Sequence, residues 1–161
     1  MSKAFTSEET PEAAPVVRSS PRLAPGERRY VTPEGHAALR AELDRLAAER
    51  ATASDPGRAE ALARRAALLE ATLAALTVLS PDAAPEGRVA FGTWVTVEDG
   101  RGARNTWRIV GPDEADARRG LVSAASPVGR ALLGCAPGDE VEVDRPGGRA
   151  ALTVVEIRRQ P

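Results

Sequence analysis

Hydrophobic residues in the first half of the chain recur at the spacing of a helix. Leu39, Leu43 and Leu46 are separated by four and three residues. After a break the same spacing returns at Leu62, Ala66, Leu69, Leu73 and Leu76. One apolar stripe with this period is typical of an amphipathic helix, so the pattern predicts two helices.

The ends of both helices can be placed from local residue chemistry. Thr32 is a good N-cap followed by Pro33, and Asp55 before Pro56 repeats the arrangement. The first helix is expected to reach about Thr52, a length of ~30 Å at 1.5 Å per residue. Two amphipathic helices with a short link pack antiparallel, and a seam of Leu and Ala suits close spacing. The sequence therefore predicts an antiparallel two-helix coiled-coil hairpin over residues 30–80.

Two segments outside these helices have the composition of irregular chain. Residues 1–29 carry four prolines among Ser, Glu, Arg and Ala and show no apolar period, which predicts a disordered leader. An arm that becomes ordered in a complex is the alternative. Residues 81–88 are rich in Pro, Ala and Gly and are predicted to be a linker.

The second half has the shorter period of β-strands. Strands are predicted at 89–91, 93–97, 106–110, 121–123, 140–143 and 152–157, with turns at 99–102 and 146–148. Ser126 and Pro127 can start a short helix that runs to Leu133 and ends at Gly134. Phe91, Trp94 and Trp107 are expected in the core. The prediction is an α+β domain over residues 89–158, built as an antiparallel sheet with one short helix.

The amino-acid composition excludes several classes of protein function. The 161 residues are 42% hydrophobic with a net charge of −1, and no apolar run approaches the roughly 20 residues that span a bilayer. A single cysteine, Cys135, and a single histidine, His36, support neither a zinc site nor a histidine-based catalytic triad. We therefore expect a cytoplasmic protein with no catalytic residues, no bound metal, no cofactor of its own and no membrane partner.

Four stretches resemble the Gre family of bacterial transcript-cleavage factors. They are Tyr-Val-Thr-Pro-Glu-Gly at 30–35, Val-Ala-Phe-Gly at 89–92, Trp-Arg-Ile-Val-Gly at 107–111, and the segment 121–134, which contains Ser-Pro-Val-Gly-Arg. The similarity covers residues 30–157. Phe91-Gly92 and Ile109-Val110-Gly111 are closer to the GreB branch than to GreA.

The resemblance implies an accessory protein of bacterial RNA polymerase that is not itself an enzyme. The hairpin would enter the secondary channel of the polymerase, and a C-terminal FKBP-like domain would dock on the channel rim. Ala125, Ser126, Pro127 and Val128 match the docking loop, although the family often has an acidic residue where this chain has Ala125. In the family, acidic residues at the hairpin tip help to hold a second Mg²⁺ in the polymerase active site, so Mg²⁺ would enter only there. A monomer is expected.

The predicted tip departs from the family pattern. The family has Gly-Asp followed after two residues by Glu-Asn, and no such string occurs between Leu46 and Leu62. The resemblance also indicates a hairpin shorter by roughly 20 residues, or ~15 Å of reach at helical rise. Asp55, Glu60 and Glu49 are the candidate tip carboxylates, and ordinary helix-end chemistry is their alternative role. We therefore predict a channel binder deficient in transcript cleavage.

Arginines near the tip match a basic patch that contacts transcript RNA in the family. Arg58, Arg64 and Arg65 could bind phosphates from one helix face. The alternative is a solvated face balanced by acidic neighbours, namely Glu60, Glu42 and Asp44.

Two other functions stay open from sequence. One is a module that binds a different protein, as short-hairpin relatives linked to nucleoside diphosphate kinase do. The other is peptidyl-prolyl isomerase activity, which only the FKBP-like fold suggests, because a proline pocket needs several aromatic walls and the whole chain has five aromatic residues.

Overall fold

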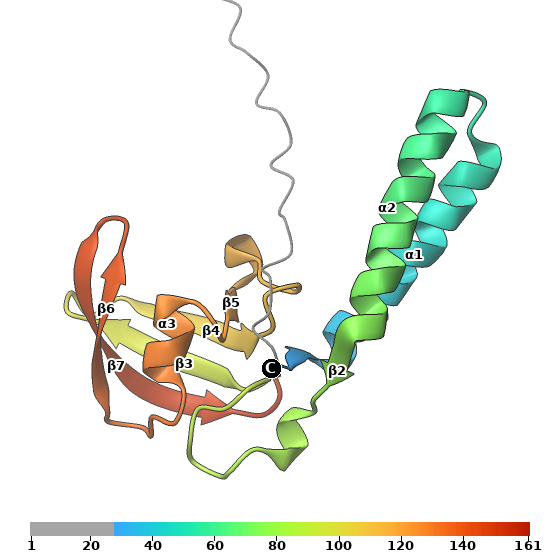
Figure 1. Ribbon diagram of the computed structural model, residues 1–161. Coiled ribbons are helices and arrows are strands. Elements are labelled where there is room, and N and C mark those ends of the chain that lie inside the picture. The colour runs from blue at the N-terminus through green and yellow to red at the C-terminus, as the bar shows by residue number, and fades with distance from the viewer. Residues whose placement is uncertain (1–27) are drawn as a thin grey trace, which may run out of the picture.

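Two long helices form an arm that extends away from a curled sheet (Figure 1). The structure is a computed structural model that describes residues 28–161, so the predicted leader lies outside the described residues except for its last two positions. Helix α1 spans Pro33–Thr52 and α2 spans Pro56–Ala75, and they run antiparallel side by side. Both helices start, and α1 ends, at the residues that the sequence predicts.

Both helices begin with a side-chain cap. Thr32 Oγ1 accepts a hydrogen bond from Gly35 N at 3.0 Å, and Asp55 Oδ2 accepts one from Arg58 N at 2.8 Å. Each cap is followed by a proline, whose missing N–H costs nothing in the first turn of a helix. The connection between the helices is therefore short, because its last residue, Asp55, is also the N-cap of α2.

The contact between the two helices buries little apolar surface. Leu46 is the only buried residue of α1 and Leu73 the only one of α2. An ion pair crosses the helices from Arg65 Nη2 to Glu42 Oε1 at 2.5 Å, but Arg65 is exposed, so it contributes little. The arm therefore depends on its attachment at the base.

A small parallel sheet at this base was not predicted from sequence. Strand β1 (Arg29–Val31) pairs with β2 (Leu76–Val78), and Leu79 N donates to the carbonyl oxygen of Val31 at 2.9 Å. The composition places Arg29 in the predicted leader, and the apolar spacing places Leu76 in the predicted helical stripe. Three-residue strands are too short to show a period, so the pattern could not separate them from their neighbours. The predicted linker contains a 3₁₀ turn, η1, at Pro81–Ala83.

The C-terminal unit is built on a five-stranded sheet. Its strands are β3 (Trp94–Asp99), β4 (Arg104–Val110), β5 (Leu121–Ser123), β6 (Glu140–Arg145) and β7 (Gly148–Arg158), in the order β5-β4-β3-β7-β6. The predicted all-antiparallel sheet is wrong at one edge, because β5 runs parallel to β4. The chain makes this crossover through residues 111–120, which include the 3₁₀ turn η2 (Ala117–Arg119).

The turn between β3 and β4 is held by one side chain. Asp99 Oδ1 accepts hydrogen bonds from Arg101 N at 2.9 Å and Ala103 N at 3.0 Å. These two bonds to the charged form lower the pKa of Asp99 below its usual range. Gly102 supplies the positive φ of 80° that completes the predicted hairpin turn.

The predicted first strand of this unit, 89–91, is wrong. The backbone of Val89 pairs instead with the segment that follows the short helix. Its N–H donates to Cys135 O and its carbonyl oxygen accepts from Gly134 N, both at 2.8 Å. The chain then turns at Gly92, whose φ is 83°. Phe91 consequently lies in a turn, half-buried, with its ring 6.0 Å from the ring of Tyr30.

Branched aliphatic side chains fill the space between the sheet and helix α3 (Pro127–Leu132), which lies across one face of it (Figure 1). The buried core is Val89, Val95, Val97, Ile109, Leu132, Val143, Leu152 and Val154. Trp107 packs against this core, as expected. Trp94 does not, since it lies beneath the guanidinium of Arg108, 5.7 Å from the ring centre. Among residues 28–161 no helix is long and apolar enough to cross a membrane.

Truncation of Leu132 should destabilise the protein strongly. Its side chain is fully buried, so Leu132→Ala leaves a cavity and should cost about 2–5 kcal/mol of unfolding free energy. Leu68→Ala is the matched control, because Leu68 is 62% exposed and should lose under about 1 kcal/mol. Urea unfolding of both variants measures the difference, and equal losses would contradict the assigned core.

Candidate functional site

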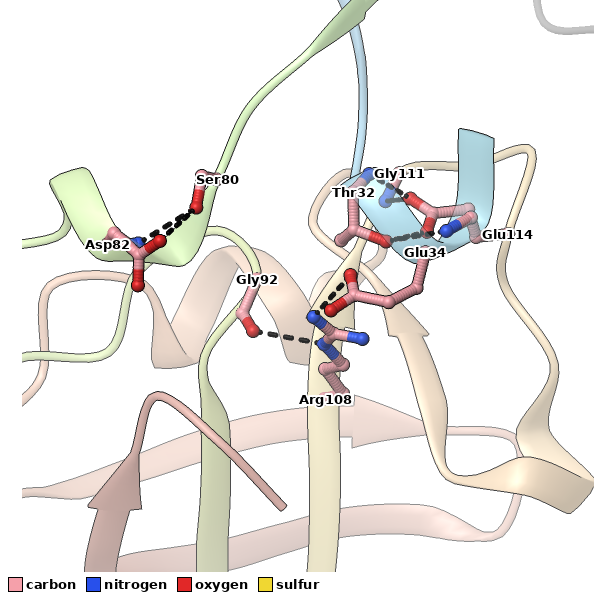
Figure 2. Close-up of polar contacts among 9 residues, drawn as sticks. Thr32, Glu34, Ser80, Asp82, Gly92, Arg108, Gly111 and Glu114 are labelled. Atoms are coloured by element: carbon pink, nitrogen blue, oxygen red, sulfur yellow. Dashed lines mark hydrogen bonds and ion pairs between the residues drawn. The ribbon is translucent and has the colours of Figure 1, made fainter. Parts of the chain in front are cut away.

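Hydrogen bonds to the carboxylate of Glu114 join the base of the hairpin to the C-terminal unit. Glu114 Oε2 accepts hydrogen bonds from Thr32 N at 2.9 Å and Gly111 N at 3.1 Å, and Oε1 accepts one from the Thr32 hydroxyl (Figure 2). Thr32 is fully buried and is also the N-cap of α1. A carboxylate at this position also interacts favourably with the helix dipole.

A second ion pair lies beside it. Arg29 Nε donates to Asp113 Oδ2 at 2.6 Å, and Arg29 Nη2 donates to the other carboxylate oxygen. The two side chains are only 8% and 12% exposed. Such bidentate pairs are directional as well as strong, so this pair sets the orientation of β1.

Arg108 makes a third link. Its Nε donates to the carbonyl oxygen of Gly92 at 3.0 Å and its Nη2 donates to Glu34 Oε2 at 2.9 Å (Figure 2). A hydrogen bond from the backbone N–H of Glu34, together with Arg108, lowers the pKa of the Glu34 carboxyl below its usual value of 4.5. We refer to the residues of these three links as the basal clasp: Arg29, Thr32, Glu34, Arg108, Asp113 and Glu114.

Two glycines make room for the basal clasp. A Cβ on Gly35 would overlap the carboxylate of Glu114, and a Cβ on Gly111 would overlap the carbonyl oxygen of Tyr30. Both positions therefore require glycine for close approach and not for an unusual backbone angle.

At the opposite end of the hairpin, two of the three candidate tip carboxylates already have structural roles. The Asp55 carboxylate caps α2, and Glu60 Oε1 accepts from Arg64 Nη1 at 2.5 Å. Glu49, near the end of α1, forms no ion pair with any residue in 28–161. The helix-end interpretation of Asp55 is confirmed.

The three arginines near the tip differ in their surroundings. Arg64 pairs with Glu60 on its own helix and Arg65 pairs with Glu42 of α1, as the solvated-face alternative expected. The predicted third acidic partner, Asp44, forms no ion pair within the described part of the chain, and neither does the exposed Arg58. Of these three arginines, Arg58 is therefore the one whose guanidinium is available to an anion.

The predicted docking loop is the start of α3. Ser126 Oγ accepts from Gly129 N at 3.0 Å and donates to Ser123 O at 2.6 Å, so it caps the helix as predicted. Ala125 and Pro127 are exposed, while Val128 packs against the core. Among residues 28–161, nothing covers the side chains of Ala125 and Pro127 on the outer surface of this cap.

Residues 28–161 contain no group of three or more His, Cys, Asp or Glu arranged to hold a metal ion. Cys135 packs against the core and its Sγ donates to Ala131 O at 3.3 Å. Burial raises the pKa of this thiol above its usual range, which disfavours the reactive thiolate. Cys135 is a structural residue.

Comparison with known proteins identifies the relatives of this chain. The family model described as "Transcription elongation factor, GreA/GreB, C-term" matches residues 84–159. Transcription elongation factor GreB of Yersinia pestis is 43% identical over 98 residues, which are 61% of this chain and 57% of that protein. GreB of Pseudomonas aeruginosa is 38% identical over 152 residues, covering 81% of this chain and 90% of the relative. This chain belongs to the GreA/GreB family.

The alignment with the Pseudomonas protein also reveals a difference in length. It extends over 152 positions but uses 81% of the 161 residues here, about 130, so about 22 positions of the relative have no counterpart in this chain. Among solved structures, GreA factor homolog 1 of Thermus thermophilus is 27% identical, with a TM-score of 0.42, covering 82% of this chain and 99% of that one.

Sequence reasoning missed the basal clasp, although a signal for it was present. Two of the stretches that carry the Gre resemblance, 30–35 and 107–111, supply Thr32, Glu34, Arg108 and both close-approach glycines. These stretches are far apart in sequence, and only the fold brings them together. Asp113 and Glu114 lie just beyond the second stretch and had no pattern of their own.

Adding a methyl group at Gly35 should loosen the basal clasp. Gly35→Ala should displace Glu114 and cost about 1–3 kcal/mol of unfolding free energy, the usual penalty for buried polar groups that lose their partners. Gly57→Ala is the matched control in the first turn of α2, where the new Cβ would lie 3.4 Å from Asp55 Oδ2. Gly57→Ala should raise the free energy of unfolding by up to about 1 kcal/mol. Thermal unfolding separates the two, and stabilisation by both would contradict the clasp.

The Glu34–Arg108 pair should make stability depend on pH. Because folding lowers the pKa of Glu34, its contribution is present above about pH 4.5 and disappears as the pH falls through the lower folded value. Glu34→Gln should reduce stability at pH 7 by less than about 1 kcal/mol, since the carboxylate is largely exposed. At a pH below the lowered pKa of Glu34, the variant and the natural protein should converge.

Glu70→Gln is the control for this measurement. Glu70 is an exposed residue of α2 with no ion pair within residues 28–161, and its replacement makes the same change of charge. A pH profile for Glu34→Gln that parallels the natural protein at all pH values would exclude the pair as a source of stability.

Proposed function

We propose that this chain binds bacterial RNA polymerase at its secondary channel and regulates elongation without stimulating transcript cleavage. The observation that carries the proposal is the tip of the hairpin, where Asp55 caps α2 and Glu60 pairs with Arg64. Family membership supports a role in transcription elongation. The contacts of Asp55 and Glu60 at the tip support the loss of cleavage stimulation.

Reach is the first physical argument. The helices have 20 residues each, so the arm is ~30 Å long. The family-model match covers residues 84–159, and the about 22 positions without a counterpart are best explained by a shorter hairpin outside that region. Their loss from two arms shortens the reach by ~16 Å. Since a Mg²⁺ ligand lies within about 2.1 Å of the ion, a tip displaced this far cannot hold the metal.

The chemistry of the tip is the second argument. A carboxylate that assists Mg²⁺ must offer free oxygens to the ion. Asp55 uses one oxygen for the N–H of Arg58, and turning it toward a metal would uncap α2. The nearest glutamate along α2, Glu60, already has a cationic partner. Asp55 and Glu60 therefore do not fit the metal-holding role, and Glu49, which has no ion pair among residues 28–161, is excluded by reach alone. No step of cleavage is assigned to these residues.

Docking would use the C-terminal unit, which we interpret as the FKBP-like domain of the family. The exposed residues Ala125 and Pro127 flank Ser126, whose hydroxyl caps α3 and also bonds to Ser123 O. A preformed loop loses little conformational entropy on binding. Arg58, which has no ion pair within the described residues, is the candidate contact to transcript RNA.

Competition on stalled polymerase tests this function. The full chain is titrated into backtracked elongation complexes that contain a limiting amount of a cleavage-competent Gre factor, and the rate of RNA shortening is measured. The rate should fall with concentration, because the chain occupies the channel without supplying a metal ligand. No change at saturating excess would exclude channel binding, and a pull-down from lysate would then identify a different protein partner.

Asp55 variants separate capping from metal binding in the same assay. Asn caps helices as well as Asp does, whereas Ala costs about 0.5–2 kcal/mol of stability. Asp55→Asn should therefore compete like the natural protein, and Asp55→Ala should melt at a lower temperature. A rise in RNA shortening with the natural chain that Asp55→Asn abolishes would show that Asp55 does reach the metal.

A further inference from the structure

A groove lies where the described part of the chain begins. It is formed by β1, the turn before β3 and the loop that leads into α3, and it has a volume of about 350 Å³. Arg28, the first described residue, lines it. We name it the basic-rimmed groove and define it by an apolar floor and two arginines: Tyr30, Phe91, Pro112, Ala124, Arg28 and Arg130.

The floor of the groove is aromatic and is shared by both parts of the molecule. Tyr30 comes from the hairpin base and Phe91 from the C-terminal unit, and their half-buried rings lie 6.0 Å apart at 57°. Grooves lined by aromatic rings commonly receive extended segments that contain proline, because such segments lose little conformational entropy on binding. The floor therefore suits a short apolar stretch with proline in it.

The rim carries positive charge that nothing in residues 28–161 neutralises. Arg28 and Arg130 are exposed and form no ion pair in this part of the chain. A third arginine at the groove, Arg29, is already paired with Asp113, and no acidic residue lines the groove among the described residues. A complementary occupant must therefore carry acidic groups beside its apolar stretch.

The sequence before residue 28 contains one segment with this chemistry. Residues 8–17 read Glu-Glu-Thr-Pro-Glu-Ala-Ala-Pro-Val-Val, with three glutamates, no lysine or arginine, and an apolar end that includes proline. Residues 1–7 contain a lysine and no acidic residue, and residues 18–27 contain two arginines and one glutamate. Of these three segments, only 8–17 has the sign of charge that the rim requires.

The length of the chain allows this segment to reach the groove. Residues 18–27 connect it to Arg28, and ten extended residues span at most about 33–36 Å. Because Arg28 itself lines the groove, this connection has only to fold back to its own end. A short tether gives the attached segment an effective concentration on the order of millimolar, so a weak contact is enough to fill the groove.

We propose that residues 8–17 of this chain bind in the basic-rimmed groove. The apolar end of the segment, 15–17, contacts the two aromatic rings, and its glutamates face the two rim arginines. The contact is intramolecular and does not rest on the proposed function. It covers Ala125, which also lines the groove, and it reinforces the attachment that the basal clasp makes, because the segment touches both parts of the molecule.

The single tyrosine of the chain reports on the groove. Tyr30 is the only tyrosine of the 161 residues, so biosynthetic labelling with fluorotyrosine places one fluorine nucleus on the floor. The fluorine NMR resonance of the full chain should differ from that of a chain that lacks residues 1–17. A peptide of residues 8–17 should return the truncated chain to the full-chain position. Removal of residues 1–7 alone should leave the resonance unchanged.

Charge variants test the contact with the rim. In the full chain, Glu8→Gln, Glu9→Gln and Glu12→Gln together should move the resonance toward that of the truncated chain. In the truncated chain, Arg130→Glu should raise the dissociation constant of the added peptide about tenfold at low salt. Thermal unfolding confirms that each variant is folded. The matched control replaces with glutamine three exposed glutamates that form no ion pair within residues 28–161 and do not line the groove: Glu49, Glu70 and Glu140.

The outcomes separate the possible occupants. If the full and truncated chains share one resonance position, or if the three leader substitutions shift it no more than the control does, the proposal is wrong. If the difference grows with protein concentration and sedimentation shows a dimer, the leader of a second copy fills the groove, which also overturns the intramolecular contact. A difference that is independent of concentration and that the peptide reverses supports the proposal.

Discussion

The carboxylate of Glu114 is the interaction on which the arrangement of this molecule depends. It joins the start of α1 to the crossover between β4 and β5 by two hydrogen bonds from Thr32, and a third bond, from Gly111 N, holds the carboxylate within the crossover. The helices themselves bury only Leu46 and Leu73, so the hairpin has no core that could orient it independently. A tilt of about 5° at the base would move the end of a ~30 Å arm by about 3 Å. Bonds at the base therefore decide where the tip lies.

The clasp is made of charged groups in a partly buried place, which explains its specificity. A hydrogen bond to a charged group contributes roughly 1.5–3 kcal/mol, but a charge that loses its partner costs at least as much. Arg29, at 8% exposure, has a stable environment only opposite Asp113. This penalty disfavours other orientations of the hairpin more than it stabilises the observed one.

The two ends of the hairpin use carboxylates for opposite purposes. At the base, Glu114 accepts donors from two separate segments and links them. At the tip, the acceptor capacity of Asp55 is directed into its own helix. Capping and metal binding compete for the same oxygens, and a short connection between helices favours capping because Pro56 follows directly. A regulator that occupies the polymerase channel without supplying a metal ligand is consistent with this geometry.

The sequence by itself determined the helices, their caps, most strands and the family. These features depend on residues close together in the chain: Thr32 and Asp55 before prolines, Leu at spacings of three and four, and Asp99 in its turn. Tertiary structure alone decided the strands β1 and β2, the parallel direction of β5, the turn at Phe91 and the basal clasp. Each of these joins segments separated by more than ten residues, from Arg108 and Leu121 to Thr32 and Glu114. No local period or propensity encodes such a pairing, because the free energy that stabilises it arises only once the chain has folded.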